Sequence, residues 1–95
     1  MNNVKQIHLI IAGRVQGVGF RAWTKKRALE LNLSGWVKNL SDGRVEVFIA
    51  GEAEEIEKML LLFRSGPKMA AVEMVEILNE TLNSSVNDAP GFDIL

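Results

Sequence analysis

Residues 5–31 read KQIHLIIAGRVQGVGFRAWTKKRALEL, and the character of this stretch changes twice. Residues 5–12 are mostly apolar on both of their alternating sides, which predicts a central strand. Three glycines follow within residues 13–19, a density that marks a loop with unusual backbone conformations. From Phe20 to Leu31 the apolar residues recur at helical spacing. The stretch therefore predicts a strand, a glycine-rich loop and a helix.

The rest of the chain continues the alternation of strands and helices. Asn32 is a residue type that ends helices in a left-handed conformation. In residues 41–44 we expect a tight hairpin turn in which Asp42 and Gly43 supply the positive φ angles. The remaining predicted segments are strands at 35–40 and 44–50, a helix at 52–63, a strand at 70–78, a polar loop at 80–90 and a short edge strand at 91–95.

This order of elements predicts one fold class. Strand, helix, strand, strand, helix, strand (βαββαβ) is the plan of a ferredoxin-like α/β sandwich, in the α+β class. We expect an antiparallel sheet of four to five strands with both helices on one face. Residues 1–95 are expected to form a single domain. Because this plan serves many unrelated functions, the fold alone says nothing decisive about activity.

Composition excludes several classes of protein. The formal net charge is -1, so no general positive field attracts nucleic acid, and we expect no nucleic-acid partner. The chain has no cysteine, which excludes disulfides, thiolate catalysis and cysteine metal sites. No apolar run approaches the roughly 20 residues that span a bilayer. The N-terminus also lacks the pattern of a signal peptide. These features predict a cytoplasmic protein with no membrane association.

The segment GRVQGVGFR, residues 13–21, can bind an anion. Consecutive backbone N–H groups in such a turn converge on one point, and the helix that follows adds further unpaired donors. Arg21 lies where the loop becomes helix, and its planar guanidinium can hold two phosphoryl oxygens. The glycine spacing matches neither the P-loop nor the dinucleotide pattern. On spacing alone, a connection that merely needs flexible residues explains the glycines equally well.

Two further polar residues have both a chemical and a structural interpretation. The amide of Asn39 can donate to one group and accept from another, which suits it to orient a water molecule. Taken alone, however, an Asn beside Asp-Gly more often caps the turn. His8 lies in the middle of the first strand, where packing or a surface position is a commoner role than catalysis.

Aromatic residues raise the possibility of a nucleic-acid-binding sheet. Trp23, Trp36 and Phe48 resemble the stacking platforms of RNA-binding modules, which use aromatic side chains on a sheet. Trp23 falls on the apolar face of its helix, however, and the hairpin strands are not rich in aromatic residues. With the net charge also unfavourable, we set this interpretation aside.

Two motifs together carry a resemblance to a known family. GRVQGVGFR at residues 13–21, followed by GWVKNLSDGRVEV at residues 35–47, resembles acylphosphatase. The similarity covers nearly the whole chain. It continues through three later segments, Ser65-Gly66-Pro67, Ala71-Val72-Glu73 and Phe92-Asp93-Ile94. The resemblance implies the same ferredoxin-like sandwich and hydrolysis of the carboxyl–phosphate bond of acyl phosphates, without metal or cofactor. It also implies a monomer whose partner is a small-molecule acyl phosphate.

The resemblance also assigns roles to residues. It makes Arg21 and Asn39 catalytic, with Arg21 binding the phosphoryl group and Asn39 positioning the attacking water. The implied phosphate-binding loop consists of Gln16, Gly17, Val18, Gly19, Phe20 and Arg21. Leu40 replaces a threonine that some members carry beside the asparagine, which removes a supporting hydroxyl. A domain of this type that only binds carbamoyl phosphate or another phosphorylated ligand is the alternative to an enzyme.

Overall fold

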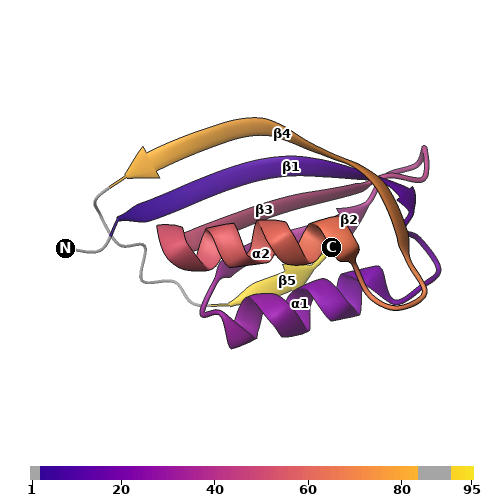
Figure 1. Ribbon diagram of the computed structural model, residues 1–95, viewed down its shortest axis with the longest axis horizontal. Coiled ribbons are helices and arrows are strands. Elements are labelled where there is room, and N and C mark those ends of the chain that lie inside the picture. The colour runs from indigo at the N-terminus through magenta and orange to yellow at the C-terminus, as the bar shows by residue number, and fades with distance from the viewer. Residues whose placement is uncertain (1–2, 84–90) are drawn as a thin grey trace.

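A computed structural model describes residues 3–83 and 91–95 (Figure 1). Five strands and two helices alternate along these residues. In chain order they are β1 (Val4–Arg14), α1 (Phe20–Glu30), β2 (Ser34–Asn39), β3 (Val45–Glu52), α2 (Ala53–Ser65), β4 (Ala71–Asn83) and β5 (Phe92–Ile94). The predicted order of elements is therefore present, with boundaries that differ by a few residues.

The strands form one sheet in the order β4-β1-β3-β2-β5. The pairs β1–β3, β1–β4 and β2–β3 are antiparallel, and the fold is the expected ferredoxin-like α+β sandwich. β5 differs from the expectation, because it pairs with β2 in parallel and makes the sheet mixed. The reason is directional: β4 runs opposite to β1, so a strand that returns from its end runs the same way as β2.

Both helices lie on one face of the sheet (Figure 1). Alternate residues of β1 point toward them, and Ile7, Leu9 and Ile11 are fully buried. The helices contribute the other half of the core, with Phe20, Ala28, Ile56, Met59 and Phe63. No helix within residues 3–83 and 91–95 is long and apolar enough to cross a membrane.

The way β4 pairs with β1 explains why the apolar residues of β4 show no simple alternation in the sequence. Its pairing with β1 shifts twice, between His8 and Leu9 and between Ala12 and Gly13. Each shift is a β-bulge, which moves the following residues to the opposite face. Apolar residues such as Val72 and Val75, three apart, consequently both pack against the core. β4 also runs to Asn83, so the polar loop predicted to begin at residue 80 is wrong for 80–83, while residues 84–90 lie outside the described residues.

The end of α1 follows its predicted turn residue, whereas the prediction for the β2–β3 hairpin is right for Gly43 and wrong for Asp42. Asn32 is left-handed, with φ 57°. In the hairpin only Gly43 has a positive φ, of 96°, whereas Asp42 does not. Asp42 instead uses its carboxylate, which accepts from the Arg44 backbone N–H at 3.1 Å and from its Nε at 2.8 Å. The Arg44 backbone N–H and guanidinium hold the pKa of Asp42 below its ordinary value.

Candidate active site

The glycine-rich loop connects β1 to α1 and leaves its backbone donors free. Gly17 and Gly19 have φ angles of 74° and 77°, a region that glycine enters at no steric cost. The first hydrogen bond of α1 runs from the Trp23 N–H to the Gly19 carbonyl at 3.0 Å. No N–H from Gln16 to Arg21 donates to a backbone acceptor anywhere in residues 3–83 and 91–95. These donors are therefore available to an anion.

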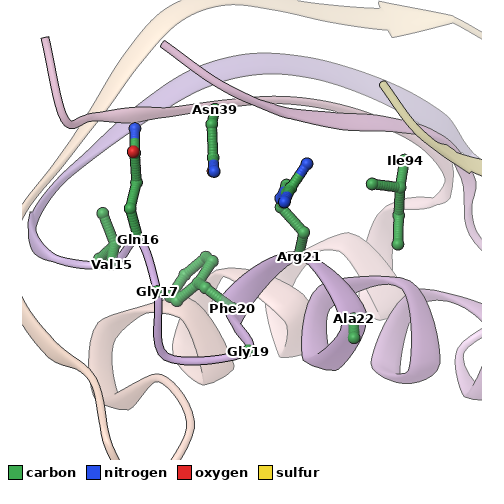
Figure 2. Close-up of a pocket in the computed structure, with 9 residues that line it drawn as sticks. All are labelled: Val15, Gln16, Gly17, Gly19, Phe20, Arg21, Ala22, Asn39 and Ile94. Atoms are coloured by element: carbon green, nitrogen blue, oxygen red, sulfur yellow. The ribbon is translucent and has the colours of Figure 1, made fainter. Parts of the chain in front are cut away.

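A pocket of about 210 Å³ opens over this loop (Figure 2). Its walls come from the loop, the first turn of α1, the end of β2 and the end of β5. The lining residues are Val15, Gln16, Gly17, Gly19, Phe20, Arg21, Ala22, Asn39 and Ile94. Arg21 is the only ionisable residue among them, so no carboxylate of residues 3–83 and 91–95 stands in the lining to repel an anion.

Arg21 is held at the start of α1, and its side chain is half-buried. Within the part of the chain that the structure describes, no carboxylate lies within ion-pair distance of its guanidinium. Arg27, six residues further along α1, differs because it pairs with Glu30 at 3.1 Å. Arg21 therefore keeps a positive charge at the pocket wall that no side chain of the described residues neutralises.

Asn39 is the last residue of β2 and faces Arg21 across the pocket. Figure 2 shows its side chain projecting from the strand toward the space above the loop. Its Oδ1 is buried and accepts no hydrogen bond from the described residues. Thr24 Oγ1 is the other described side-chain oxygen in this condition, but Thr24 does not line the pocket. A buried acceptor without a partner is costly, so Asn39 is suited to a polar ligand.

Gln16 takes a different orientation from the rest of the loop. Its Nε2 donates to the Leu40 carbonyl at 2.7 Å and to the Arg44 carbonyl at 3.0 Å. Figure 2 shows this side chain rising from the loop toward the strand that carries Asn39. Both N–H groups of the side-chain amide therefore donate to the β2–β3 hairpin. The backbone N–H of Gln16 is the donor that remains for an anion.

The structure brings together six of the seven residues predicted for the site. Val18 is the exception, because its side chain packs against the hydrophobic core and does not line the pocket. Its predicted contribution is through the backbone N–H, which has no backbone acceptor within the described residues. The side chain of Phe20 is buried and stacks on Phe63, with ring centroids 6.2 Å apart, which anchors the start of α1.

Sequence reasoning missed three apolar lining residues, Val15, Ala22 and Ile94. The first two flank the predicted loop and are found once the loop is located. Ile94 comes from β5, at the far end of the chain, and nothing in its local sequence marks it. Phe92, which is buried, and the Leu95 N–H, which donates to the Val37 carbonyl at 2.9 Å, hold this strand in place.

The remaining candidates from sequence lie elsewhere. His8 Nε2 is 2.6 Å from Glu46 Oε2 and does not line the pocket. Trp23 is half-buried against the core, with its ring centroid 5.4 Å from that of Phe20. Trp36 stacks on Phe48 of the neighbouring strand at 6.3 Å. Residues 3–83 and 91–95 hold no group of three or more His, Cys, Asp or Glu side chains placed to bind a metal ion.

Comparison with known proteins gives a consistent result. The family model described as acylphosphatase matches residues 7–94. The chain is 42% identical over 95 residues to an acylphosphatase of Roseiflexus sp. (strain RS-1), covering 100% of this chain and 99% of the relative. It is 51% identical over 70 residues to one of Chloroflexus aurantiacus, covering 74% and 76% of the two chains.

A solved structure agrees with these sequence matches. The structure of an acylphosphatase from Coxiella burnetii is similar at a TM-score of 0.83, with 41% identity, and the match covers 98% of this chain and 94% of that one. The matched region includes the loop, Arg21 and Asn39. The chain therefore belongs to the acylphosphatase family, whose members are enzymes that hydrolyse acyl phosphates.

Proposed function

We propose that this chain hydrolyses the carboxyl–phosphate bond of acyl phosphates by direct attack of a water molecule on the phosphorus atom. In this proposal residues 16–21 and the Arg21 guanidinium hold the phosphoryl group, and Asn39 orients the water. The observation that carries it is the convergence on one pocket of polar groups without internal partners. Among the described residues these groups are the backbone N–H groups of the loop, the Arg21 guanidinium and the Asn39 amide, and Arg21, Asn39 and most of the loop residues line the pocket.

The phosphoryl group is assigned to the loop because of charge. The free N–H groups and the first turn of α1 supply donors and a partial positive charge, and Arg21 adds a full charge. A guanidinium matches two phosphoryl oxygens at once. Charge that develops on these oxygens in the transition state then meets donors that are already in place, which lowers the barrier without further reorganisation.

The attacking water is assigned to Asn39 because of where this residue lies in the pocket and because its amide is able to form hydrogen bonds. Asn39 lies on β2, across the pocket from the loop. Its amide forms a hydrogen bond with the water and directs the water's lone pair toward phosphorus, in line with the leaving oxygen. The new P–O bond forms as the acyl P–O bond breaks, and the carboxylate leaves with the electron pair. A phosphoryl oxygen receives the proton of the water.

The proposal needs no acid to assist the departing group, since a carboxylate is a stable anion. The lining accordingly offers no ionisable group except Arg21. The pocket is also smaller than the roughly 300–1,000 Å³ of sites for drug-sized ligands. Its volume of about 210 Å³ suits a phosphoryl group with a small acyl group, which Ala22 and Ile94 would contact.

The wider setting of the enzyme is part of the proposal. Every group assigned above belongs to this chain, and activity as a monomer is part of the proposal. The cytoplasmic location and the independence from metal and cofactor remain predictions from the sequence and the family. The same holds for the single domain over residues 1–95 and for the absence of a nucleic-acid partner.

The test is hydrolysis of benzoyl phosphate by the purified chain. The proposal predicts release of benzoate and phosphate in equal amounts, with most of the rate lost in Arg21→Ala and Asn39→Ala variants that remain folded. Saturable phosphate binding without turnover would instead identify a binding module. Full turnover in both variants would show that the reaction occurs elsewhere on the molecule.

A further inference from the structure

The only hydrogen bonds between the loop and the β2–β3 hairpin, within the described residues, come from one side chain. Gln16 Nε2 reaches the carbonyl of Leu40 at 2.7 Å and that of Arg44 at 3.0 Å. Leu40 and Arg44 also close the hairpin, because the Leu40 N–H donates to the Arg44 carbonyl at 2.8 Å. One amide nitrogen thus bonds to both sides of the hairpin, just after β2 ends and just before β3 begins.

This closure is adjacent to Asn39. Asn39 and Val45 are paired residues of β2 and β3, and Leu40 and Arg44 are the next positions outward. A bond to the Leu40 carbonyl therefore fixes the backbone one residue from the Asn39 side chain. At its other end, Gln16 belongs to the loop that lines the pocket. The side chain joins the two halves of the site directly.

Apart from this side chain, apolar packing holds the loop in place. Its N–H groups from Gln16 onward make no backbone hydrogen bonds inside the described structure, and Gly17 and Gly19 are exposed. The packing of Val15 and Phe20 anchors its two ends, and Val18 packs against the core between them. Without Gln16, the stretch between these ends would lose its only polar attachment to the hairpin.

We propose that Gln16 is a positioning residue whose side chain sets the distance between the phosphoryl group in the loop and the water held by Asn39. This inference rests on the proposed function. In-line attack requires the reacting atoms about 3–3.5 Å apart and aligned, and a displacement of about 1 Å can reduce the rate about 10²-fold. Gln16 is therefore expected to act on the reaction rate more than on the affinity for phosphate.

The test is Gln16→Met, which keeps the length and neutrality of the side chain and removes both donors. The matched control is Gln6→Met in β1, because Gln6 is also half-buried but its side chain makes no hydrogen bond with the described residues. Three quantities are measured for each: kcat with benzoyl phosphate, the competitive inhibition constant of inorganic phosphate, and the midpoint of thermal unfolding. Gln16→Met is expected to lower kcat about 10- to 100-fold and to change the inhibition constant less than about threefold.

A second measurement separates positioning from general stability. If Gln16 acts through Asn39, Gln16→Met should lower kcat far less in an Asn39→Ala background than in the unaltered chain. Should Gln16→Met fail to fold, Gln16→Asn replaces it, because that amide is one methylene too short to reach both carbonyls.

Three results would overturn the positioning role while leaving the proposed function intact. They are an unchanged kcat in the folded variant, a loss confined to phosphate affinity, and an equal loss in both backgrounds. No hydrolysis by the unaltered chain would overturn the proposed function and this inference together.

Discussion

Replacing Arg21 by lysine separates charge from geometry at the pocket wall. Lysine keeps the positive charge but presents one ammonium group in place of a planar guanidinium with two parallel donors. Arg21 is half-buried and has no carboxylate partner within the described chain, so its donors are free for the phosphoryl oxygens. The substitution should cost one charge-assisted hydrogen bond, about 1.5–3 kcal/mol. At about 1.4 kcal/mol per factor of ten, kcat/KM should fall about 10- to 150-fold.

The assay is benzoyl phosphate hydrolysis with thermal unfolding followed on the same sample. Arg27→Lys is the matched control, since Arg27 lies on the same helix, is exposed and does not line the pocket. The control should retain full activity, and both variants should unfold close to the unaltered chain. A folded Arg21→Lys protein with near-native turnover would refute the proposal that the Arg21 guanidinium binds two phosphoryl oxygens at once. It would show that Arg21 supplies only a general positive potential.

Three further predictions concern the other parts of the site and the sheet. Asn39→Ala should lower kcat about 10²- to 10³-fold with little change in phosphate inhibition, and a loss mainly in phosphate affinity would contradict its role. Inorganic phosphate should inhibit competitively, and hydrolysis should continue in EDTA. Loss of activity in EDTA that one divalent ion restores would contradict a phosphate site made only of backbone N–H groups and Arg21. Gly35→Ala should lower the free energy of urea unfolding by about 2–4 kcal/mol, because its Cβ would lie 1.8 Å from the Phe48 carbonyl at φ 140°. Gly43→Ala, which has open space, should cost less, and equal costs would contradict the steric argument.

The local features of the fold were predictable because single residues specify them. The left-handed conformation of Asn32 and the hairpin at residues 41–44 both follow from turn chemistry. Even there, Asp42 was assigned a positive φ that it does not have, because its carboxylate bonds to Arg44 instead. Turn composition does not say which of two adjacent residues takes the unusual conformation.

Features that depend on distant pairing were harder to predict. The two bulges in the β1–β4 pairing place residues of both parities on one face, so the alternation in β4 gives no clear register. The length of β4 also follows from its partner, since Thr81, Leu82 and Asn83 pair with the start of β1 despite their loop-like composition. The parallel pairing of β5 with β2 depends on the path of the whole chain.

The site shows the same division. The loop and Asn39 were predicted from motifs, and the fold places them on one pocket. Two features of the site were not predicted: the position of Ile94 in the pocket lining and the two side-chain hydrogen bonds of Gln16. Each depends on contact between segments that are far apart in the sequence. Glutamine in a loop carries no signal of the carbonyl it will reach. Only the structure shows that this side chain turns toward the hairpin.

Hydrolysis of benzoyl phosphate in ¹⁸O-labelled water tests the central claim most directly, because the label records which atom the water attacks. If the loop and Arg21 hold the phosphoryl group for a water oriented by Asn39, the enzyme-dependent product should carry the label in inorganic phosphate. The benzoate should then contain none. Label in the benzoate would mean attack at the carbonyl carbon, and it would contradict the assignment of the pocket to phosphoryl transfer.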